Sequence, residues 1–153
     1  MYHYESCGLE NVWLKNGYTE STTKYGDGVS INDVEGLHCA LALEIVHLPR
    51  PITAREFRFL RIELDLSQRQ LAGLMGLTDQ TIAKYEKGQS PITRLADTTL
   101  RNFFLESVNQ ESKVRDLLEE LIELDNGISD LEREQETLEL DFESGTWHPA
   151  AAA

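Results

Sequence analysis

The feature that most constrains this chain is the residue spacing between positions 68 and 82. If Gln68 is counted as the first position, a small residue, Ala72, is the fifth. A glycine, Gly76, is the ninth, and a branched apolar residue, Ile82, is the fifteenth. The small side chain lets two helices cross closely, the glycine supplies the positive φ of a sharp turn, and the branched side chain seats the second helix on the first. The spacing therefore predicts two short helices joined by a tight turn.

Polar cap residues predict where the neighbouring helices begin. A Thr-x-x-Glu capping box starts at Thr53, and a Ser-x-x-Gln box starts at Ser67. In such a box the hydroxyl accepts from the helix N-terminus and the longer side chain reaches back. Thr78 is the expected cap of the next helix, and a fourth helix is predicted over residues 91–105. Residues 54–105 are thus predicted to be a bundle of four helices.

The run from Leu66 to Gly88 opens with Leu-Ser-Gln and ends with Tyr-Glu-Lys-Gly. It closely resembles the phage-repressor-like, Xre-type helix-turn-helix family. The resemblance covers about residues 52–105 and implies a DNA-binding bundle whose second motif helix enters a major groove. It also implies a structural ion pair between Arg61 and Glu86, because removing either partner would leave a buried charge.

The exposed side of the second motif helix carries the predicted DNA readers. Gln80 can pair with adenine, the methyl of Thr81 can touch a thymine methyl, and Lys84 can reach guanine or a phosphate. Asp79 has three open roles: it caps the helix, accepts from a cytosine, or repels phosphate. Gln68 and Arg69, at the start of the preceding helix, are placed to contact a DNA phosphate. The complete predicted set is Gln68, Arg69, Thr78, Asp79, Gln80, Thr81, Lys84 and Lys87.

Residues 1–48 are predicted to form a small β-rich domain that ends in a helix. Asn16-Gly17 is a two-residue hairpin signal, and the Thr- and Tyr-rich run that follows has the composition of a strand. A further turn is expected at residues 26–28. Apolar residues at every third or fourth position predict a helix over residues 36–48. Two prolines then mark a short linker at residues 49–53.

The order of these segments resembles the MqsA-type antitoxins, since Cys7-Gly8 and Gly36-Leu37-His38-Cys39 stand where that family carries its two cysteine pairs. That resemblance implies a protein that neutralises a ribonuclease toxin and represses its own operon as a dimer. The family holds zinc with two Cys-X-X-Cys pairs, but Tyr4 and Ala42 occupy two of the four positions. Half of the ligand set is absent, and the histidine spacing is not that of such a site. We therefore expect no metal and no cofactor. A small apolar core is predicted from Tyr4, Cys7, Cys39 and Ala42.

Charge is spread unevenly along the chain, whose net charge is −13. Residues 1–50 hold 3 bases and 7 acids, residues 51–105 hold 8 bases and 6 acids, and residues 106–153 hold 3 bases and 14 acids. Only the middle part, at +2, suits a polyanion such as DNA. The last part, at −11, is either a solvated helix face or a surface for a basic partner.

Residues 106–142 are predicted to form a long acidic, coiled-coil-like helix, or a helical hairpin that breaks at Asn126-Gly127. Apolar residues follow a heptad seam that runs from Val114 to Phe142 and is interrupted by Gln135. Residues 143–153 are expected to be a frayed tail. The predicted dimerisation residues come from the end of the fourth bundle helix and from this seam: Leu100, Phe103, Phe104, Leu117, Leu121, Leu124, Ile128 and Leu131.

The predicted fold is therefore mainly α, with a small N-terminal α+β part, a phage-repressor-like helix-turn-helix bundle and an acidic C-terminal helix. The predicted function is that of a cytoplasmic, nucleoid-associated repressor that binds a palindromic operator in double-stranded DNA as a homodimer. The alternative is an antitoxin or protein-interaction module that mainly neutralises a basic ribonuclease toxin. No apolar run approaches membrane-span length, the histidines are scattered, and there is no phosphate-binding glycine loop. Membrane association and catalysis are not expected.

Overall fold

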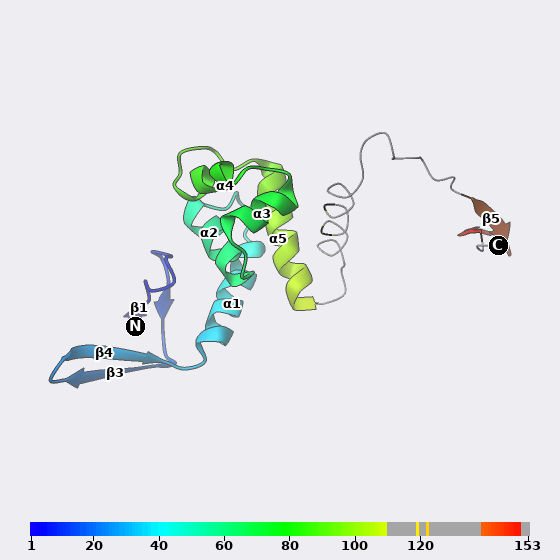
Figure 1. The fold of residues 1–153 in the computed structure, drawn as a ribbon. Coiled ribbons are helices and arrows are strands. Elements are labelled where there is room, and N and C mark those ends of the chain that lie inside the picture. Colours follow the sequence, from blue (N-terminus) through cyan, green and yellow to red (C-terminus); the bar gives the residue numbers. More distant parts are fainter. Residues whose placement is uncertain (110–118, 120–121, 123–138, 151–153) are drawn as a thin grey trace.

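The computed structural model describes residues 1–109, 119, 122 and 139–150, and within them the fold is a mixture of helices and small strand pairs (Figure 1). The helices are α1 (Val34–Val46), α2 (Ala54–Glu63), α3 (Gln68–Met75), α4 (Asp79–Glu86) and α5 (Arg94–Asn109). The strands are β1 (Tyr2–His3), β2 (Trp13–Leu14), β3 (Tyr18–Thr23), β4 (Gly26–Ile31), β5 (Leu140–Glu143) and β6 (Thr146–Pro149). They pair antiparallel as β1–β2, β3–β4 and β5–β6. None of the described helices is both long and apolar enough to cross a membrane.

Helices α1 to α5, here called the helical body, share one hydrophobic core with the N-terminal segment. Helix α1 packs against α2 and α5, and Ala42 on α1 is fully buried. Tyr4 and Leu9, from the segment that carries β1 and β2, belong to the same cluster of buried side chains as Phe57 of α2 and Leu100 of α5. Residues 1–48 are therefore held to the bundle by apolar packing.

Both predicted capping boxes are present. The Thr53 hydroxyl accepts from the Glu56 backbone N–H at 3.2 Å, and the Glu56 carboxylate accepts from the Thr53 N–H at 2.8 Å. Ser67 and Gln70 make the same exchange at 3.0 and 2.9 Å. Burial acts to raise the pKa of Glu56, but hydrogen bonds from Arg50 and Thr53 outweigh it and hold that pKa below its usual value. The starts of α2 and α3 are therefore fixed by local hydrogen bonds.

The N-terminal hairpin turns at a different place from the one predicted. The chain reverses at Lys24-Tyr25, so that Thr23 pairs with Gly26, and the expected turn at residues 26–28 lies inside β4. Gly17 has a positive φ of 79°, but its carbonyl accepts from Asn32 N–H at 2.8 Å at the base of the hairpin. The six-residue run of β3 finds a partner of equal length in β4, whereas β2 has only two residues and pairs with β1. The longer ladder satisfies more backbone groups.

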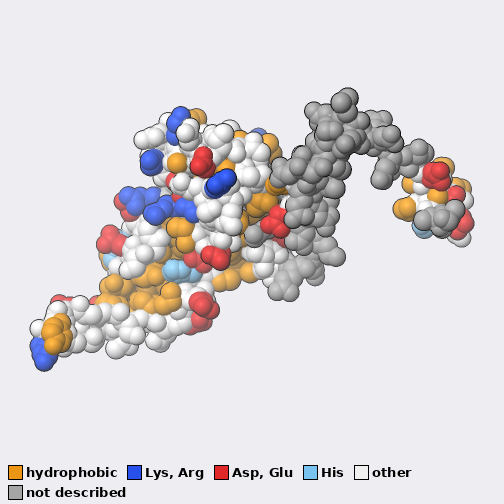
Figure 2. Space-filling view, in the orientation of Figure 1, with side chains coloured by type: hydrophobic (Ala, Val, Ile, Leu, Met, Phe, Trp, Pro, Cys, Tyr) orange, Lys and Arg blue, Asp and Glu red, His pale blue; other side chains and the backbone are white. Residues whose placement is uncertain are grey.

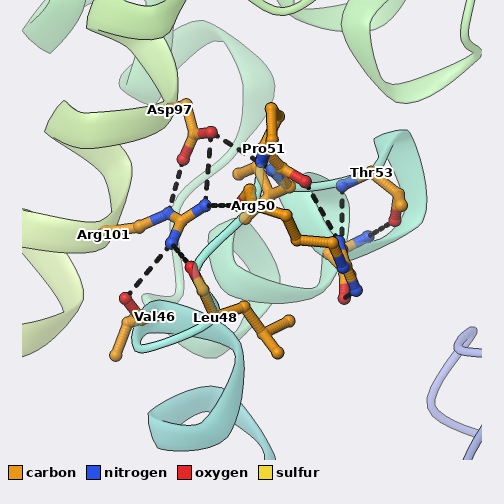
Figure 3. A network of polar contacts seen from close by, with 9 residues as sticks. Val46, Leu48, Arg50, Pro51, Thr53, Asp97 and Arg101 are labelled. Carbon is orange, nitrogen blue, oxygen red and sulfur yellow. Dashed lines mark hydrogen bonds and ion pairs between the residues drawn. The ribbon is translucent and has the colours of Figure 1, made fainter.

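The segment between α1 and α2 is fixed to α5 by Arg101 and Asp97 (Figure 3). Arg101 Nη1 donates to the carbonyls of Leu48 at 2.7 Å and Val46 at 3.3 Å, at the end of α1. Arg101 Nε donates to Asp97 Oδ1 at 2.6 Å, and Asp97 Oδ2 accepts from the Ile52 N–H at 3.1 Å. The last carbonyls of α1 thus obtain the partners that the helix itself cannot provide. The proline-containing linker is held in place by these contacts.

The C-terminal end corrects the predicted helix and tail. Leu140–Glu143 and Thr146–Pro149 form a hairpin with Ser144 and Gly145 at its turn, both at positive φ. The alternation Leu-Asp-Phe-Glu has the period of a strand, and Ser-Gly suits a tight turn. Phe142, assigned to the heptad seam, pairs instead with Trp147. The five seam residues predicted for dimerisation lie outside the described residues: Leu117, Leu121, Leu124, Ile128 and Leu131.

The structure also corrects the other three predicted dimerisation residues. Leu100, Phe103 and Phe104 are 0, 2 and 4% exposed and belong to the core of their own chain. Helix α5 has one strongly apolar face, and this face packs against α1 and α2. These side chains are therefore not available to a second copy.

Candidate nucleic-acid interface

The turn between α3 and α4 has the geometry that the residue spacing predicts. Gly76 ends α3 in the left-handed region, with φ 67°, and the Leu77 N–H donates to the Ala72 carbonyl at 2.9 Å. This is the usual way in which a glycine closes a helix. Ala72 is 2% exposed and Ile82 is 0% exposed, and α3 packs against α4. The two helices are consequently held at a fixed crossing.

Helix α4 presents two long polar side chains that have no partner within the described part of the chain. Gln80 and Lys84 are exposed, and among the described residues neither side chain makes a hydrogen bond or an ion pair. Thr81 is half-buried, and its hydroxyl lies 2.9 Å from the hydroxyl of Thr78. Thr78 also caps the helix by accepting from the Thr81 N–H at 3.2 Å. The two long side chains are therefore free to meet a ligand, while the two threonines fix the helix start.

Of the three roles left open for Asp79, the cap itself is supplied by Thr78, and Asp79 is the first residue of α4. Asp79 Oδ1 accepts from the Gln80 backbone N–H at 2.9 Å, at the first turn of α4. A carboxylate at a helix N-terminus is stabilised by the unpaired N–H groups and by the helix dipole. The side chain is exposed.

The N-terminus of α3 is a second polar part of this surface. The capping box uses the N–H of Gln70. The earlier N–H groups of the first turn, those of Gln68 and Arg69, have no acceptor within an α-helix. Gln68 is half-buried and Arg69 is exposed. Unpaired N–H groups, a helix dipole and an arginine make a suitable position for a phosphate.

A buried ion pair joins α2 to the last residue of α4. Arg61 Nε and Nη2 donate to the two carboxylate oxygens of Glu86, each at 2.8 Å. Arg61 Nη1 also donates to the Leu66 carbonyl at 2.8 Å. The two charged side chains are only 12 and 3% exposed, whereas Arg58, 3.8 Å from Glu86, is 60% exposed. The bidentate pair fixes the end of α4 that lies opposite Thr78.

Positive charge lies over this part of the molecule. Figure 2 shows Lys and Arg side chains over the upper part of the helical body, where Figure 1 places α2, α3 and α4. Lys87, directly after α4, is exposed, as are Arg69 and Lys84. All eight predicted DNA-binding residues are brought by the structure to α3, α4 and their flanking positions.

Cys7 lies in the N-terminal segment and Cys39 lies on α1. Both are free and half-buried, and they pack against the core to which the buried Tyr4 and Ala42 belong. Within the described residues, no three His, Cys, Asp or Glu side chains lie close enough together to hold a metal ion.

A chain of hydrogen bonds that the sequence did not indicate lies beside these cysteines. The Tyr4 hydroxyl is 2.8 Å from His38 Nε2, and His38 Nδ1 is 2.8 Å from Glu63 Oε1. Burial, together with the nearby Cys7 and Glu63, raises the pKa of Tyr4. The three residues come from the first strand region, α1 and α2, so no local motif could have revealed the contact.

A family model described as a helix-turn-helix matches residues 57–95. The match extends from α2 to the start of α5 and includes every residue of the interface described above. No curated protein and no solved structure matches the chain significantly. The match supports a DNA-binding regulator of the Xre-like helix-turn-helix kind, while the resemblance to MqsA-type antitoxins stays a prediction.

Proposed function

We propose that this chain is a sequence-specific transcription regulator that reads DNA with α4. The observation that carries the proposal is that Gln80 and Lys84 stand exposed, without partners among the described residues, on a helix held rigidly from both ends. Its N-terminus is capped by Thr78 and its C-terminus is tied to α2 by the Arg61–Glu86 pair. A rigid helix with free polar side chains is suited to a major groove. The helix-turn-helix match supports the same reading.

The two parts of the interface have different roles in this proposal. Gln80 reads an adenine edge and Lys84 reads guanine or a phosphate, so these two residues discriminate between sequences. Arg69 and Lys87, with the N–H groups at the start of α3, bind phosphates and set the register of α4 in the groove. No step of this function is catalytic.

Replacing Gln80 or Lys84 with alanine tests the proposal. Each change is expected to cost about 1–3 kcal/mol on the preferred site, which is first selected from random DNA. Titrations at one fixed salt concentration, on the selected site and on unrelated DNA, measure the effect. Gln80→Ala should leave binding to unrelated DNA nearly unchanged. Lys24→Ala, at the exposed tip of the β3–β4 hairpin, is the matched control and should change neither affinity. An equal loss on all sequences for Gln80→Ala would show that Gln80 does not read bases.

The proposal includes a homodimer on a palindromic operator. A single recognition helix reads only a few base pairs, and two helices about one DNA turn apart read a palindrome. Since Leu100 and Phe103 are buried in their own chain, the heptad seam is the remaining candidate for the dimer contact. That seam lies outside the described residues, and its support is the apolar repeat in the sequence.

Charged substitutions in the seam test the dimer. Leu121→Glu combined with Leu124→Glu is expected to halve the mass of the full chain, because buried like charges would separate two seams. The same variant should bind a half-site as well as the unmodified chain does and lose its preference for the palindrome. Light scattering measures the mass, and Thr137→Glu, outside the seam, is the control. An unchanged mass would show that the seam does not join two copies.

An autoregulatory antitoxin is the second candidate function. The order of the N-terminal cysteines, strands and helix-turn-helix favours it, as does an acidic segment suited to a basic toxin. A basic ribonuclease encoded by the adjoining gene, inhibited by the purified chain, would support this candidate. An isolated gene would favour a free-standing regulator.

A further inference from the structure

The β5–β6 hairpin has two chemically different faces. Successive residues of a strand point to opposite faces, and directly paired residues share one. The pairs Leu140–Pro149 and Phe142–Trp147 therefore lie on one face, which is entirely apolar. The pairs Asp141–His148 and Glu143–Thr146 lie on the other face, which is polar and carries two carboxylates.

The large side chains of the apolar face are exposed. Leu140, Phe142 and Trp147 are 60, 59 and 68% exposed. The rings of Phe142 and Trp147 lie against each other across the strands, with their centroids 5.1 Å apart. A two-stranded hairpin is only marginally stable in water by itself, and exposed aromatic side chains in a group mark a contact surface. The hairpin has the properties of an element that is completed by another molecule.

Charge decides between the possible occupants of this face. The hairpin belongs to residues 106–153, which hold 14 acids and 3 bases. A second hairpin would bring its own Glu139, Asp141 and Glu143 and no Lys or Arg, and DNA would bring phosphates, so the hairpin would repel both. A basic protein is instead attracted to such a segment, and complementary charge both speeds association and selects the partner.

We propose that the β5–β6 hairpin is a docking element for a basic protein. Phe142 and Trp147 insert into an apolar cleft of that partner, as aromatic anchors do at the centre of protein interfaces. Asp141 and Glu143, on the opposite face, contribute to the acidic field that steers the partner to the hairpin. The inference does not depend on whether α4 binds DNA.

Site-specific cross-linking in the cells that produce the protein tests the occupant. The photoreactive residue benzoylphenylalanine replaces Trp147 in the full chain, and mass spectrometry identifies what it captures. The control places the same residue at Tyr25, an aromatic position 89% exposed at the tip of the β3–β4 hairpin. The expected result is one protein of basic isoelectric point captured at position 147 and absent at position 25. Capture of a second copy, capture only within the same chain, or no capture above the control would overturn the proposal.

Binding of the purified captured protein then tests the two faces separately. Trp147→Ser is expected to weaken binding about 30-fold or more, as the loss of a central aromatic anchor does. Asp141→Lys with Glu143→Lys leaves the apolar face intact and is expected to slow association and to reduce its dependence on salt. Thr146→Ser, on the polar face, is the control. If neither variant weakens binding, the hairpin is not the docking element. The DNA affinity of Trp147→Ser and Thr146→Ser should equal that of the unmodified chain, so failure here is distinct from failure of the proposed function.

Discussion

Replacing Arg101 with alanine is expected to lower the free energy of unfolding by about 3–5 kcal/mol, which is the usual cost of removing one partner of a buried ion pair. Asp97 is 9% exposed, and among the described residues its carboxylate would keep one donor, the Ile52 N–H. The carbonyls of Val46 and Leu48 would lose the donor that Arg101 supplies. The expected loss is large because one side chain serves the end of α1, the linker and α5 together.

Urea denaturation followed by circular dichroism measures this effect. Arg94→Ala is the matched control, because Arg94 lies on the same helix and is exposed; its effect should stay within about 0.5 kcal/mol. Arg101→Lys keeps the charge but loses the planar fork that reaches several acceptors at once, so it should fall between the two. If Arg101→Ala were no more destabilising than Arg94→Ala, the network in Figure 3 would not hold the linker.

The parts of the fold that could be predicted from the sequence are those encoded within a few residues. The capping boxes at Thr53 and Ser67 are local hydrogen-bond patterns, and both are present in the structure. Gly76 and Ile82 occupy their predicted positions for the same reason, since a turn and one packing contact need only the intervening residues. The exposed face of α4 follows from its helical period. The positions of the residues in the candidate interface could therefore be predicted from the sequence.

The contacts between distant segments could not be predicted from a single sequence. Arg101 reaches carbonyls more than fifty residues away, and an arginine carries no mark of its acceptor. The apolar face of α5 was equally ambiguous, because an apolar stripe looks the same whether it packs in its own core or on a second copy. The structure resolves this for Leu100 and Phe103, which are buried within the chain.

The positions of the hairpin turns also could not be predicted from the sequence. Asn16-Gly17 is a stronger hairpin signal than Lys24-Tyr25, yet the chain turns at the latter. Strand length decided the outcome, because β3 and β4 match in length and form six residue pairs. The hairpin at the C-terminus was missed for a related reason. Its alternation is only four residues long on each strand and follows a heptad repeat that also accounts for Phe142.

Loss of the Arg61–Glu86 pair is the second change expected to have a large effect, and it is expected to affect both stability and DNA recognition. Arg61→Ala should cost about 3–5 kcal/mol of unfolding free energy, because the Glu86 side chain is 3% exposed and, among the described residues, would keep only Arg58, at 3.8 Å, as an ion-pair partner. The pair also fixes the end of α4. The variant should therefore lose affinity for the selected operator by more than it loses affinity for unrelated DNA.

Two further variants separate the stability effect from the recognition effect. Arg58→Ala removes an exposed cation beside the same carboxylate and should cost at most about 1 kcal/mol, as exposed pairs do. Arg61→Met with Glu86→Leu replaces the pair with apolar side chains of similar volume, a change that is often neutral or stabilising. This double variant should recover most of the unfolding free energy. If it also recovers operator preference, packing of α2 on α4 is sufficient to orient the readers. If operator preference stays low while stability returns, the bidentate geometry itself sets the direction in which Gln80 and Lys84 point. Equal stability of Arg61→Ala and Arg58→Ala would contradict the structural role of the pair.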